Sequence, residues 1–266
     1  MARRRRIALD SPVRLRGMTG PVLRPVEMKD LDTLEVVLGR AFEDDPLMMF
    51  IFDGKPDQLR RIGRLFRLFA SVHLGHEGCS TTDDVAGAAL WAPPGKWQLG
   101  WTTQLRMAPQ LLLLLGPVAL KHLGDFNRME KFHDSMPPDH WYLAVLGTDP
   151  SRQGEGVGSA LLQPVLDRCD AEGKGAYLES SKQSNLAFYS RFGFEVLEER
   201  SFTNGPSYWP MWRDPSGLAG GGALALLGDL GPSRGIERHL AQSHPVGRDL
   251  DTLVALDELE RLLECE

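Results

Sequence analysis

The sequence predicts an α/β domain in which a buried strand leads through a glycine-rich turn into a helix. Residues 141–147 are almost continuously apolar, which is typical of a strand covered on both faces. Turn-forming residues at 148–151 lead into a glycine-rich segment at 153–159. From Val157 the apolar residues take helical spacing, and a second short strand is expected at 176–179. This alternation of strand and helix indicates the α/β class.

Regular elements are also expected on both sides of this unit. Asp30 is expected to cap a helix at 31–42, and Gly116-Pro117 is expected to divide the helical segment 96–135 into two helices. The other expected elements are an edge strand at 22–27, an apolar segment at 47–52, a basic amphipathic helix at 57–73, a hairpin of strands at 75–81 and 85–91, and a strand at 207–213, where Pro210 favours a sheet edge or a bulge.

The chain is expected to hold one domain with an extension at each end. The domain spans residues 21–213 and includes the helical insertion at 96–135. Residues 1–20 form an irregular tail with a basic start but no apolar signal-peptide core. Residues 214–266 combine a glycine-rich linker with a C-terminal helix at 250–263, which can dock on the domain or on a partner chain.

Composition excludes several classes of function. The 266-residue chain has a formal net charge of -6, which gives no case for general nucleic-acid binding. Its most apolar stretch, 109–120, is shorter than the roughly 20 residues that a membrane span needs. Three widely spaced cysteines indicate a reducing compartment, and His239 and His244 lack partners for a metal site. We therefore expect a cytoplasmic protein that binds no membrane, nucleic acid or metal.

The glycine-rich turn has the properties of a phosphate site. The first N–H groups of a helix have no partner within the helix, and the helix dipole favours negative charge there. Glycines let the backbone approach a phosphate closely. A phosphate-bearing ligand is therefore expected at 153–159, with Arg152 or Lys182 as a local cation. The turn lacks the Gly-Lys-Ser/Thr of a Walker loop and the G-x-G-x-x-G spacing of a dinucleotide fold.

Two motifs in this region resemble those of the Gcn5-related N-acetyltransferase (GNAT) superfamily. The first is Q-x-x-G-x-G, formed by Gln153, Gly156 and Gly158. The second places Asn185 four residues before Tyr189, with Gly-Phe shortly after. The resemblance is close over 141–199 and looser over 21–213. It implies the GNAT fold, which is a mixed, strongly bent central sheet with helices on both faces.

The resemblance also implies acetyl-CoA as co-substrate and a set of residues that hold it. The diphosphate is expected on the glycine-rich turn, and the pantetheine arm is expected to lie along the 141–148 strand, at a splay opened by a bulge. Asn185 is expected to bind this arm, although asparagine is also a good helix N-cap. The implied cofactor-binding residues are Leu146, Thr148, Gln153, Gly154, Gly156, Val157, Gly158, Ser159 and Asn185.

Tyr189 and Glu179 are the catalytic candidates. Tyr189 matches the family's general acid, which protonates the departing thiolate; the competing interpretation is a core aromatic residue. Glu179 ends the second core strand and is the first candidate for the base that deprotonates the amine. The other candidates for this base are Asp45, Glu77, Asp139 and His140, and a neutral amine or a chain of water molecules would need none of them.

The function implied is transfer of an acetyl group from acetyl-CoA to a primary amine by direct attack in a ternary complex. A small-molecule acceptor is favoured, because the inserted helices can enclose an acceptor site. They can equally be packing or a homodimer surface, and the apolar segment 47–52 can be core or acceptor lining. Protein lysines or N-termini are the alternative acceptors. From another class, a non-catalytic CoA-binding regulatory module remains open.

Overall fold

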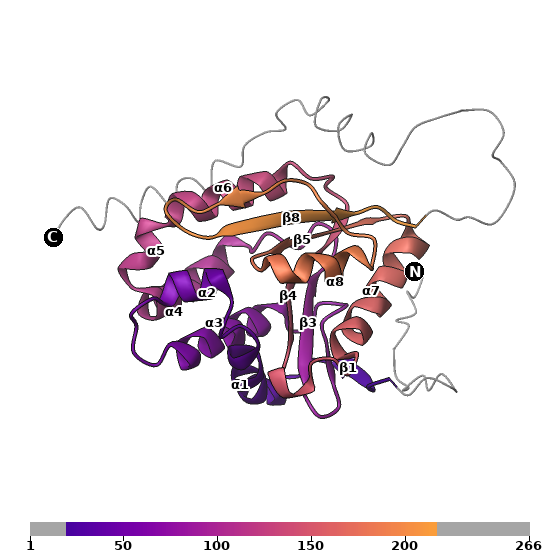
Figure 1. Ribbon diagram of the computed structural model, residues 1–266, viewed down its shortest axis with the longest axis horizontal. Helices are drawn as coiled ribbons and strands as arrows, with labels where there is room; N and C mark the ends of the chain where they lie inside the picture. The colour runs from indigo at the N-terminus through magenta and orange to yellow at the C-terminus, as the bar shows by residue number, and fades with distance from the viewer. Residues whose placement is uncertain (1–19, 217–266) are drawn as a thin grey trace, which may run out of the picture.

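The computed structural model describes residues 20–216, except for the side chains of residues 119 and 120. A central sheet runs through this region and helices flank it (Figure 1). No helix in this part of the chain is long and apolar enough to cross a membrane. The predicted tail up to residue 19, the glycine-rich linker and the C-terminal helix lie outside the described residues.

The sheet is mixed and mostly antiparallel, which confirms the predicted fold class. All neighbouring strands pair antiparallel except β4 and β5, which are parallel. In Figure 1, β3 and β4 run in a clearly different direction from β5 and β8. In spatial order the strands are β1 (Leu23–Pro25), β2 (Ser80–Thr82), β3 (Gly87–Ala92), β4 (His140–Thr148), β5 (Gly175–Ser180), β8 (Ser207–Arg213) and β6 (Glu195–Val196), and β7 (Arg200–Ser201) also pairs with β8.

Helices cover both faces of the sheet because the central strands are apolar on both sides. Leu90 and Val145 pack into the same core as α1 and α3, whereas Trp91 and Leu143 pack with α7. Successive side chains of a strand point to opposite faces, so a near-continuous apolar run is needed to fill both cores. The helices concerned are α1 (Leu31–Ala41), α3 (Gln58–His73) and α7 (Val157–Glu172).

The apolar segment after α1 forms the short helix α2 (Pro46–Phe52). Asp45 is its N-cap, and one carboxylate oxygen accepts hydrogen bonds from the N–H groups of Leu47 and Met48 at 3.0 and 3.1 Å. Most of its apolar side chains are buried against α1 and α3. Of the two interpretations of this segment, the structure supports the core helix.

The helical insertion contains α4 (Trp101–Leu115), α5 (Pro117–Lys121) and α6 (Leu123–Asp134). The break at Gly116 was predicted, and its φ of +60° is one that glycine adopts readily. A second break at His122 was not predicted, so the segment holds three helices rather than two. The break at His122 depends on contacts made by Asp125. Asp125 Oδ2 lies 3.0 Å from His122 Nδ1, and Asp125 Oδ1 accepts a hydrogen bond from the Thr203 N–H at 3.0 Å.

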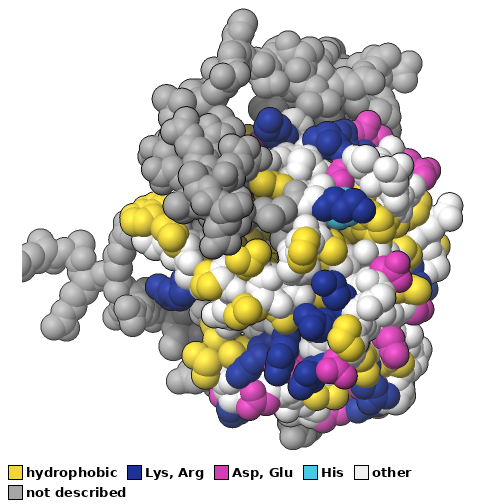
Figure 2. Space-filling model, turned by 90° about the vertical axis from the view of Figure 1, so that its left-hand side faces the viewer, with side chains coloured by type: hydrophobic (Ala, Val, Ile, Leu, Met, Phe, Trp, Pro, Cys, Tyr) yellow, Lys and Arg dark blue, Asp and Glu magenta, His cyan; other side chains and the backbone are white. Residues whose placement is uncertain are grey.

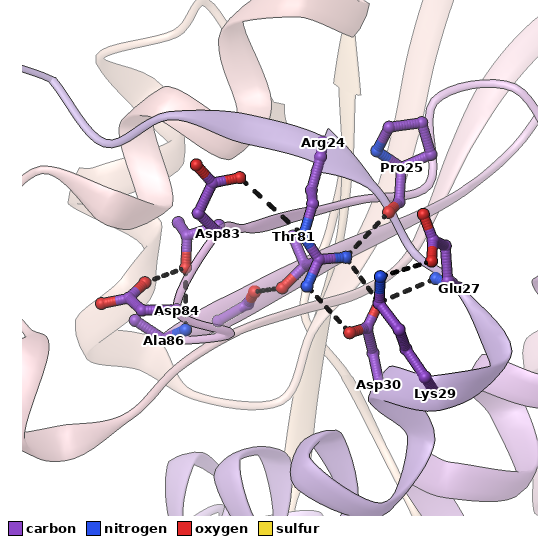
Figure 3. Close-up of polar contacts among 11 residues, drawn as sticks. Arg24, Pro25, Glu27, Lys29, Asp30, Thr81, Asp83, Asp84 and Ala86 are labelled. Carbon is purple, nitrogen blue, oxygen red and sulfur yellow. Dashed lines mark hydrogen bonds and ion pairs between the residues drawn. The ribbon is translucent and has the colours of Figure 1, made fainter.

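Asp30 does not cap α1 as predicted. Its buried carboxylate makes no capping bond to this helix and instead accepts two hydrogen bonds from Arg24, at 2.6 and 2.8 Å, and one from the Glu27 N–H at 2.8 Å (Figure 3). The Arg24 hydrogen bonds hold the pKa of Asp30 below its usual value, against the effect of burial. The paired charges fasten the edge strand β1 to the start of α1.

Of the two alternatives predicted for Pro210, the sheet edge is wrong and the bulge is supported. The register on one side of β8 shifts by one residue there, because Glu195 lies opposite Trp212 but Arg200 lies opposite Tyr208. Strand β8 lies between β5 on one side and β6 and β7 on the other. The Pro210 carbonyl accepts from the Leu197 N–H at 2.9 Å, and the N–H and C=O of a residue in an antiparallel ladder point to the same neighbour. The missing donor of Pro210 therefore faces the interruption between β6 and β7, where no ladder bond is lost.

Candidate active site

A gap opens between β4 and β5 in the middle of the sheet. The two strands pair only from His140 opposite Gly175 to Tyr142 opposite Tyr177. On the other side of β4, Leu90 of β3 lies opposite Val145 and Trp91 of β3 lies opposite Leu143. This register shift leaves Ala144 of β4 as the extra residue of a β-bulge. Beyond the last pair, no strand among residues 20–216 lies against the edge of β4 that faces β5.

Main-chain groups of β4 point into this gap. The Asp149 N–H donates to the Ala86 carbonyl at 2.8 Å and so is directed toward β3. Because these groups alternate between the two sides of a strand, those of Leu146 and Thr148 face away from β3. An extended ligand can therefore form strand-like hydrogen bonds along this edge.

The glycine-rich turn ends where α7 begins, and its N–H groups are unoccupied. The first helical bond runs from the Ala160 N–H to the Gly156 carbonyl at 2.9 Å, and within residues 20–216 no hydrogen bond engages the N–H groups of 153–159. Gly154 and Gly156 both have a φ of +82°, which disfavours any residue with a Cβ. The turn thus presents free donors at the positive end of a 16-residue helix.

One cleft of about 540 Å³ joins the turn and the gap. Glu179 does not line it, whereas Tyr189 and all the implied cofactor-binding residues do: Leu146, Thr148, Gln153, Gly154, Gly156, Val157, Gly158, Ser159 and Asn185. Its other walls come from the end of α1, the start of α2 and the segment after β5. Residues far apart in the sequence therefore meet around a space that can hold a ligand of nucleotide size.

Asn185 faces the cleft without capping a helix. It ends the 3₁₀ turn Gln183–Asn185 and precedes α8 (Leu186–Ser190), but its exposed side chain makes no capping hydrogen bond. Asn185 therefore occupies the N-cap position of α8 without making the capping bond, and its amide is available to a ligand.

Comparisons with known proteins agree with this geometry. Residues 133–214 match a family model described as "Acetyltransferase (GNAT) domain". An uncharacterised N-acetyltransferase of Schizosaccharomyces pombe is 29% identical over 186 residues, which cover 64% of this chain and 72% of the relative. The chain contains a GNAT acetyltransferase domain at residues 133–214. It is therefore an acyltransferase of a family that uses acetyl-CoA as co-substrate.

Solved GNAT structures show the same fold. A Corynebacterium glutamicum structure, described as histone acetyltransferase HPA2 and related acetyltransferase, is 25% identical with a TM-score of 0.53, and the match covers 74% of this chain and 97% of the other. Arylalkylamine N-acetyltransferase 2 of Aedes aegypti is 14% identical with a TM-score of 0.51, and the match covers 72% and 97%. The second likeness shows the fold alone.

Tyr189 is both part of the core and part of the cleft wall. Its side chain is buried on α8 in edge contacts with Phe188 and Phe194, and it also lines the cleft. Burial, and to a smaller extent the nearby Asp45 carboxylate, raise the pKa of Tyr189 above its usual value. The phenol therefore stays protonated at neutral pH. Core packing and contact with the cleft coexist at this residue.

Glu179 lies outside the cleft lining, on the face of β5 opposite Leu178. Burial raises the pKa of Glu179 to about 7, although part of its side chain meets solvent. The hydroxyls of Tyr142 and Tyr177 lie close to the carboxylate and oppose this rise. The buried Tyr177 Oη has no hydrogen-bond partner within the described residues. A carboxyl with a pKa near 7 is suited to accept a proton at neutral pH.

The other candidate bases are engaged elsewhere. Asp45 caps α2, and Glu77 pairs with Arg168 at 2.5 Å. Asp139 pairs with Lys174 at 3.2 Å, while His140 is buried with its Nε2 only 2.8 Å from His133 Nε2. Among the described residues no group of three or more His, Cys, Asp or Glu side chains could hold a metal ion.

Sequence reasoning missed two features of the cleft. Asp45 reaches across to the segment after β5, where the Ser181 hydroxyl donates to Asp45 Oδ2 at 2.5 Å. Arg191, which follows α8, lines the cleft as a third cation beside Arg152 and Lys182. The position of Arg191 three residues after Phe188 was a usable signal, because that spacing places two side chains on one helix face.

Proposed function

We propose that this protein transfers the acetyl group of acetyl-CoA to a primary amine of a small molecule, by direct attack in a ternary complex. The observation that carries the proposal is the continuity of three features in one cleft. These are the free N–H groups of 153–159, the open edge of β4 and the buried hydroxyl of Tyr189. Each supports one part of the reaction.

The donor's diphosphate fits the turn at the start of α7. Several unpaired N–H donors and the helix dipole stabilise negative charge there without any side-chain cation. The pantetheine arm can then run along β4 and bond to the main chain of Leu146 and Thr148. An N–H at Leu146 beside the thioester carbonyl would stabilise the oxyanion that forms on attack.

Glu179 is the proposed base. The amine arrives as an ammonium ion, and loss of one proton to the carboxylate leaves the lone pair that attacks the thioester carbon. With a pKa of about 7, Glu179 is partly ionised at neutral pH and can still pass the proton to solvent. Glu179 lies on the face of β5 away from the cleft lining, and the proposal requires the amine to approach from this face.

Tyr189 is the proposed acid. When the C–S bond breaks, the thiolate of CoA takes the phenolic proton, and the tyrosinate is later reprotonated from solvent. The ordinary pKa of a thiol, about 8.5, lies below that of the phenol, so full transfer is uphill and hydrogen bonding to the thiolate contributes much of the stabilisation. As the tetrahedral intermediate collapses, its nitrogen loses a second proton to solvent, which offsets the proton that Tyr189 recovers. The reaction as a whole then releases one proton, the one that Glu179 removes from the ammonium ion.

The inserted helices support a small acceptor. Phe50 of α2 lies 4.6 Å from the His122 ring, measured between ring centroids, and Phe126 of α6 lies 5.2 Å from Phe202. These contacts join α2, the insertion and the loop after β7 in one aromatic cluster, and we propose that this cluster borders the acceptor side of the cleft. An enclosed side suits a small amine better than a lysine on a folded protein.

The test is release of free thiol when the full chain is mixed with acetyl-CoA and one acceptor at a time. The acceptors are polyamines, arylalkylamines, amino acids, lysine-containing peptides and peptides with free N-termini. Turnover on a small amine at a kcat/KM well above that of every peptide supports the proposal. A preference for peptides identifies a protein acetyltransferase, and binding of CoA without turnover on any acceptor identifies a non-catalytic module.

A further inference from the structure

Three cationic side chains line the cleft, and two of them form ion pairs with carboxylates of the protein. Arg152 donates to Glu155 at 2.7 Å and also pairs with Asp84. Lys182 pairs with Asp44 at 2.5 Å. Within the described residues Arg191 has no carboxylate at ion-pair distance; the contact given for its guanidinium is the ring of Phe188, 5.4 Å from Cζ to the ring centroid. Arg191 therefore brings an uncompensated positive charge to the cleft wall.

The Phe188 ring fixes where this charge lies relative to the phosphate turn. A Cβ added to Gly158 would lie 3.4 Å from Phe188 Cζ, so the ring packs directly against the first turn of α7. The same ring contacts Arg191. The guanidinium is thus one aromatic ring away from the free N–H groups, on the side of the cleft formed by α8.

We propose that Arg191 binds the 3′-phosphate on the ribose of CoA, and so selects acyl donors that carry this phosphate monoester. The inference rests on the proposed binding of acetyl-CoA in the cleft. In CoA this phosphate is separated from the diphosphate by one ribose, which matches one aromatic ring between Arg191 and the turn. A phosphate monoester carries a charge of about -1.5 to -2 at neutral pH, and a guanidinium can bond two of its oxygens.

The rest of the cleft cannot supply this interaction. The N–H groups at the start of α7 are directed at the diphosphate, and the helix dipole acts only within about one turn. Arg152 and Lys182 would have to leave carboxylate partners to bind a second phosphate. In a chain of net charge -6, a dianionic group at the cleft mouth needs a local cation.

A structural role for Arg191 makes a different prediction. An arginine that only packs on Phe188 would, when removed, disturb the cleft wall and weaken every ligand of the cleft alike. An arginine that binds the 3′-phosphate affects ligands with this group and leaves those without it unchanged. Dephospho-CoA, which lacks only the 3′-phosphate, separates the two roles.

The experiment is calorimetric titration of CoA and dephospho-CoA into the full chain at low salt. Wild type is expected to bind CoA about tenfold or more tightly than dephospho-CoA. Arg191→Gln is expected to bind both with the affinity that wild type has for dephospho-CoA, and Arg191→Lys to keep part of the preference. Arg200→Gln is the control, because Arg200 also lies over a ring, 4.7 Å from the centroid of Phe132, but outside the cleft.

The outcomes separate this inference from the proposed function. If wild type binds CoA and dephospho-CoA equally, or if Arg191→Gln keeps the preference, Arg191 does not bind the 3′-phosphate, while acetyl-CoA binding stands. If Arg191→Gln lowers the affinity for CoA and for dephospho-CoA by the same factor, Arg191 has a packing role, and this result also overturns the inference. If neither ligand binds wild type, the proposed function fails as well.

Discussion

The Ser181 hydroxyl donates to the Asp45 carboxylate at 2.5 Å, and this bond joins two walls of the cleft that are 136 residues apart in the chain. The other oxygen of the same carboxylate caps α2. Asp44 and Lys182, the preceding and following neighbours of this pair, form an ion pair at 2.5 Å. The start of α2 is thereby fastened to the segment that leads from β5 to α8.

This arrangement predicts a larger stability cost at Asp45 than at Asp44. Asp45→Ala leaves the N–H groups of Leu47 and Met48 without a side-chain partner, so the free energy of unfolding should fall by about 1–2 kcal/mol. Asp44→Ala removes an exposed ion pair and should change it by less than about 1 kcal/mol. Urea denaturation of both variants measures the difference. Equal losses would show that the capping bonds contribute nothing beyond the ion pair.

Tyr189→Phe should lower kcat by about 100-fold or more and leave the affinity for acetyl-CoA within about threefold of wild type. The variant keeps the ring contacts with Phe188 and Phe194 and removes only the hydroxyl that we propose protonates the thiolate. Rapid-mixing kinetics of a single turnover, with titration of acetyl-CoA binding, separates the two effects. Tyr208→Phe, outside the cleft, is the control. An unchanged single-turnover rate in Tyr189→Phe would remove the acid role.

The activity should rise with pH through about 7. Below this value the Glu179 carboxyl is protonated and cannot accept the proton of the amine, so kcat/KM should fall as the pH is lowered. Glu179→Gln should be slower by about 100-fold near neutrality and lack this limb of the profile. The measurement is kcat/KM from pH 5.5 to 8.5 with an amine whose own pKa lies above this range. If Glu179→Gln still loses activity as the pH falls through 7, another group is responsible for this part of the pH profile.

The same carboxyl should also affect stability in a pH-dependent way. Its pKa is raised from 4.5 in the unfolded chain to about 7 in the folded one, so the folded state binds the proton more tightly. The resulting stabilisation is complete below pH 4.5 and is lost as the pH rises through 7. At high pH the folded chain must keep a buried, charged carboxylate at Glu179, which lowers the free energy of unfolding. Glu179→Gln removes this cost. Its melting temperature relative to wild type should therefore be more favourable at pH 8 than at pH 5, and a constant difference would contradict the raised pKa.

The parts of the fold that follow from local pattern could be predicted from the sequence. The strand at 140–148, the turn and α7 follow from apolar runs, glycines and helical spacing, because both faces of β4 are buried and α7 is buried on one face. The turn with free N–H groups could be located for the same reason, since such groups at a helix start depend only on where the helix begins.

The errors arise where a side chain has a partner that is distant in sequence. Aspartate is a residue type that often caps helices, but the Asp30 carboxylate instead accepts hydrogen bonds from Arg24 on the adjoining strand. The helix break at His122 depends on Asp125, which in turn bonds Thr203, 78 residues away. The raised pKa of Glu179 needs the three-dimensional surroundings of Tyr142 and Tyr177. Such pairings leave no periodic signal in a single sequence.

Gly156→Ala should weaken acetyl-CoA binding by about tenfold, and a second glycine separates this effect from general destabilisation. Gly156 begins α7 with a φ of +82°, and Gly173 ends the same helix with a φ of +66°; at both positions an added Cβ meets open space. Alanine at either one therefore carries a similar backbone strain of about 1–2 kcal/mol. Both variants should lose comparable stability in urea denaturation. Only Gly156→Ala turns the N–H groups of the turn away from the phosphate, so only this variant should raise the KM for acetyl-CoA. A similar rise in Gly173→Ala would mean that the loss reflects a less stable α7 rather than the phosphate turn.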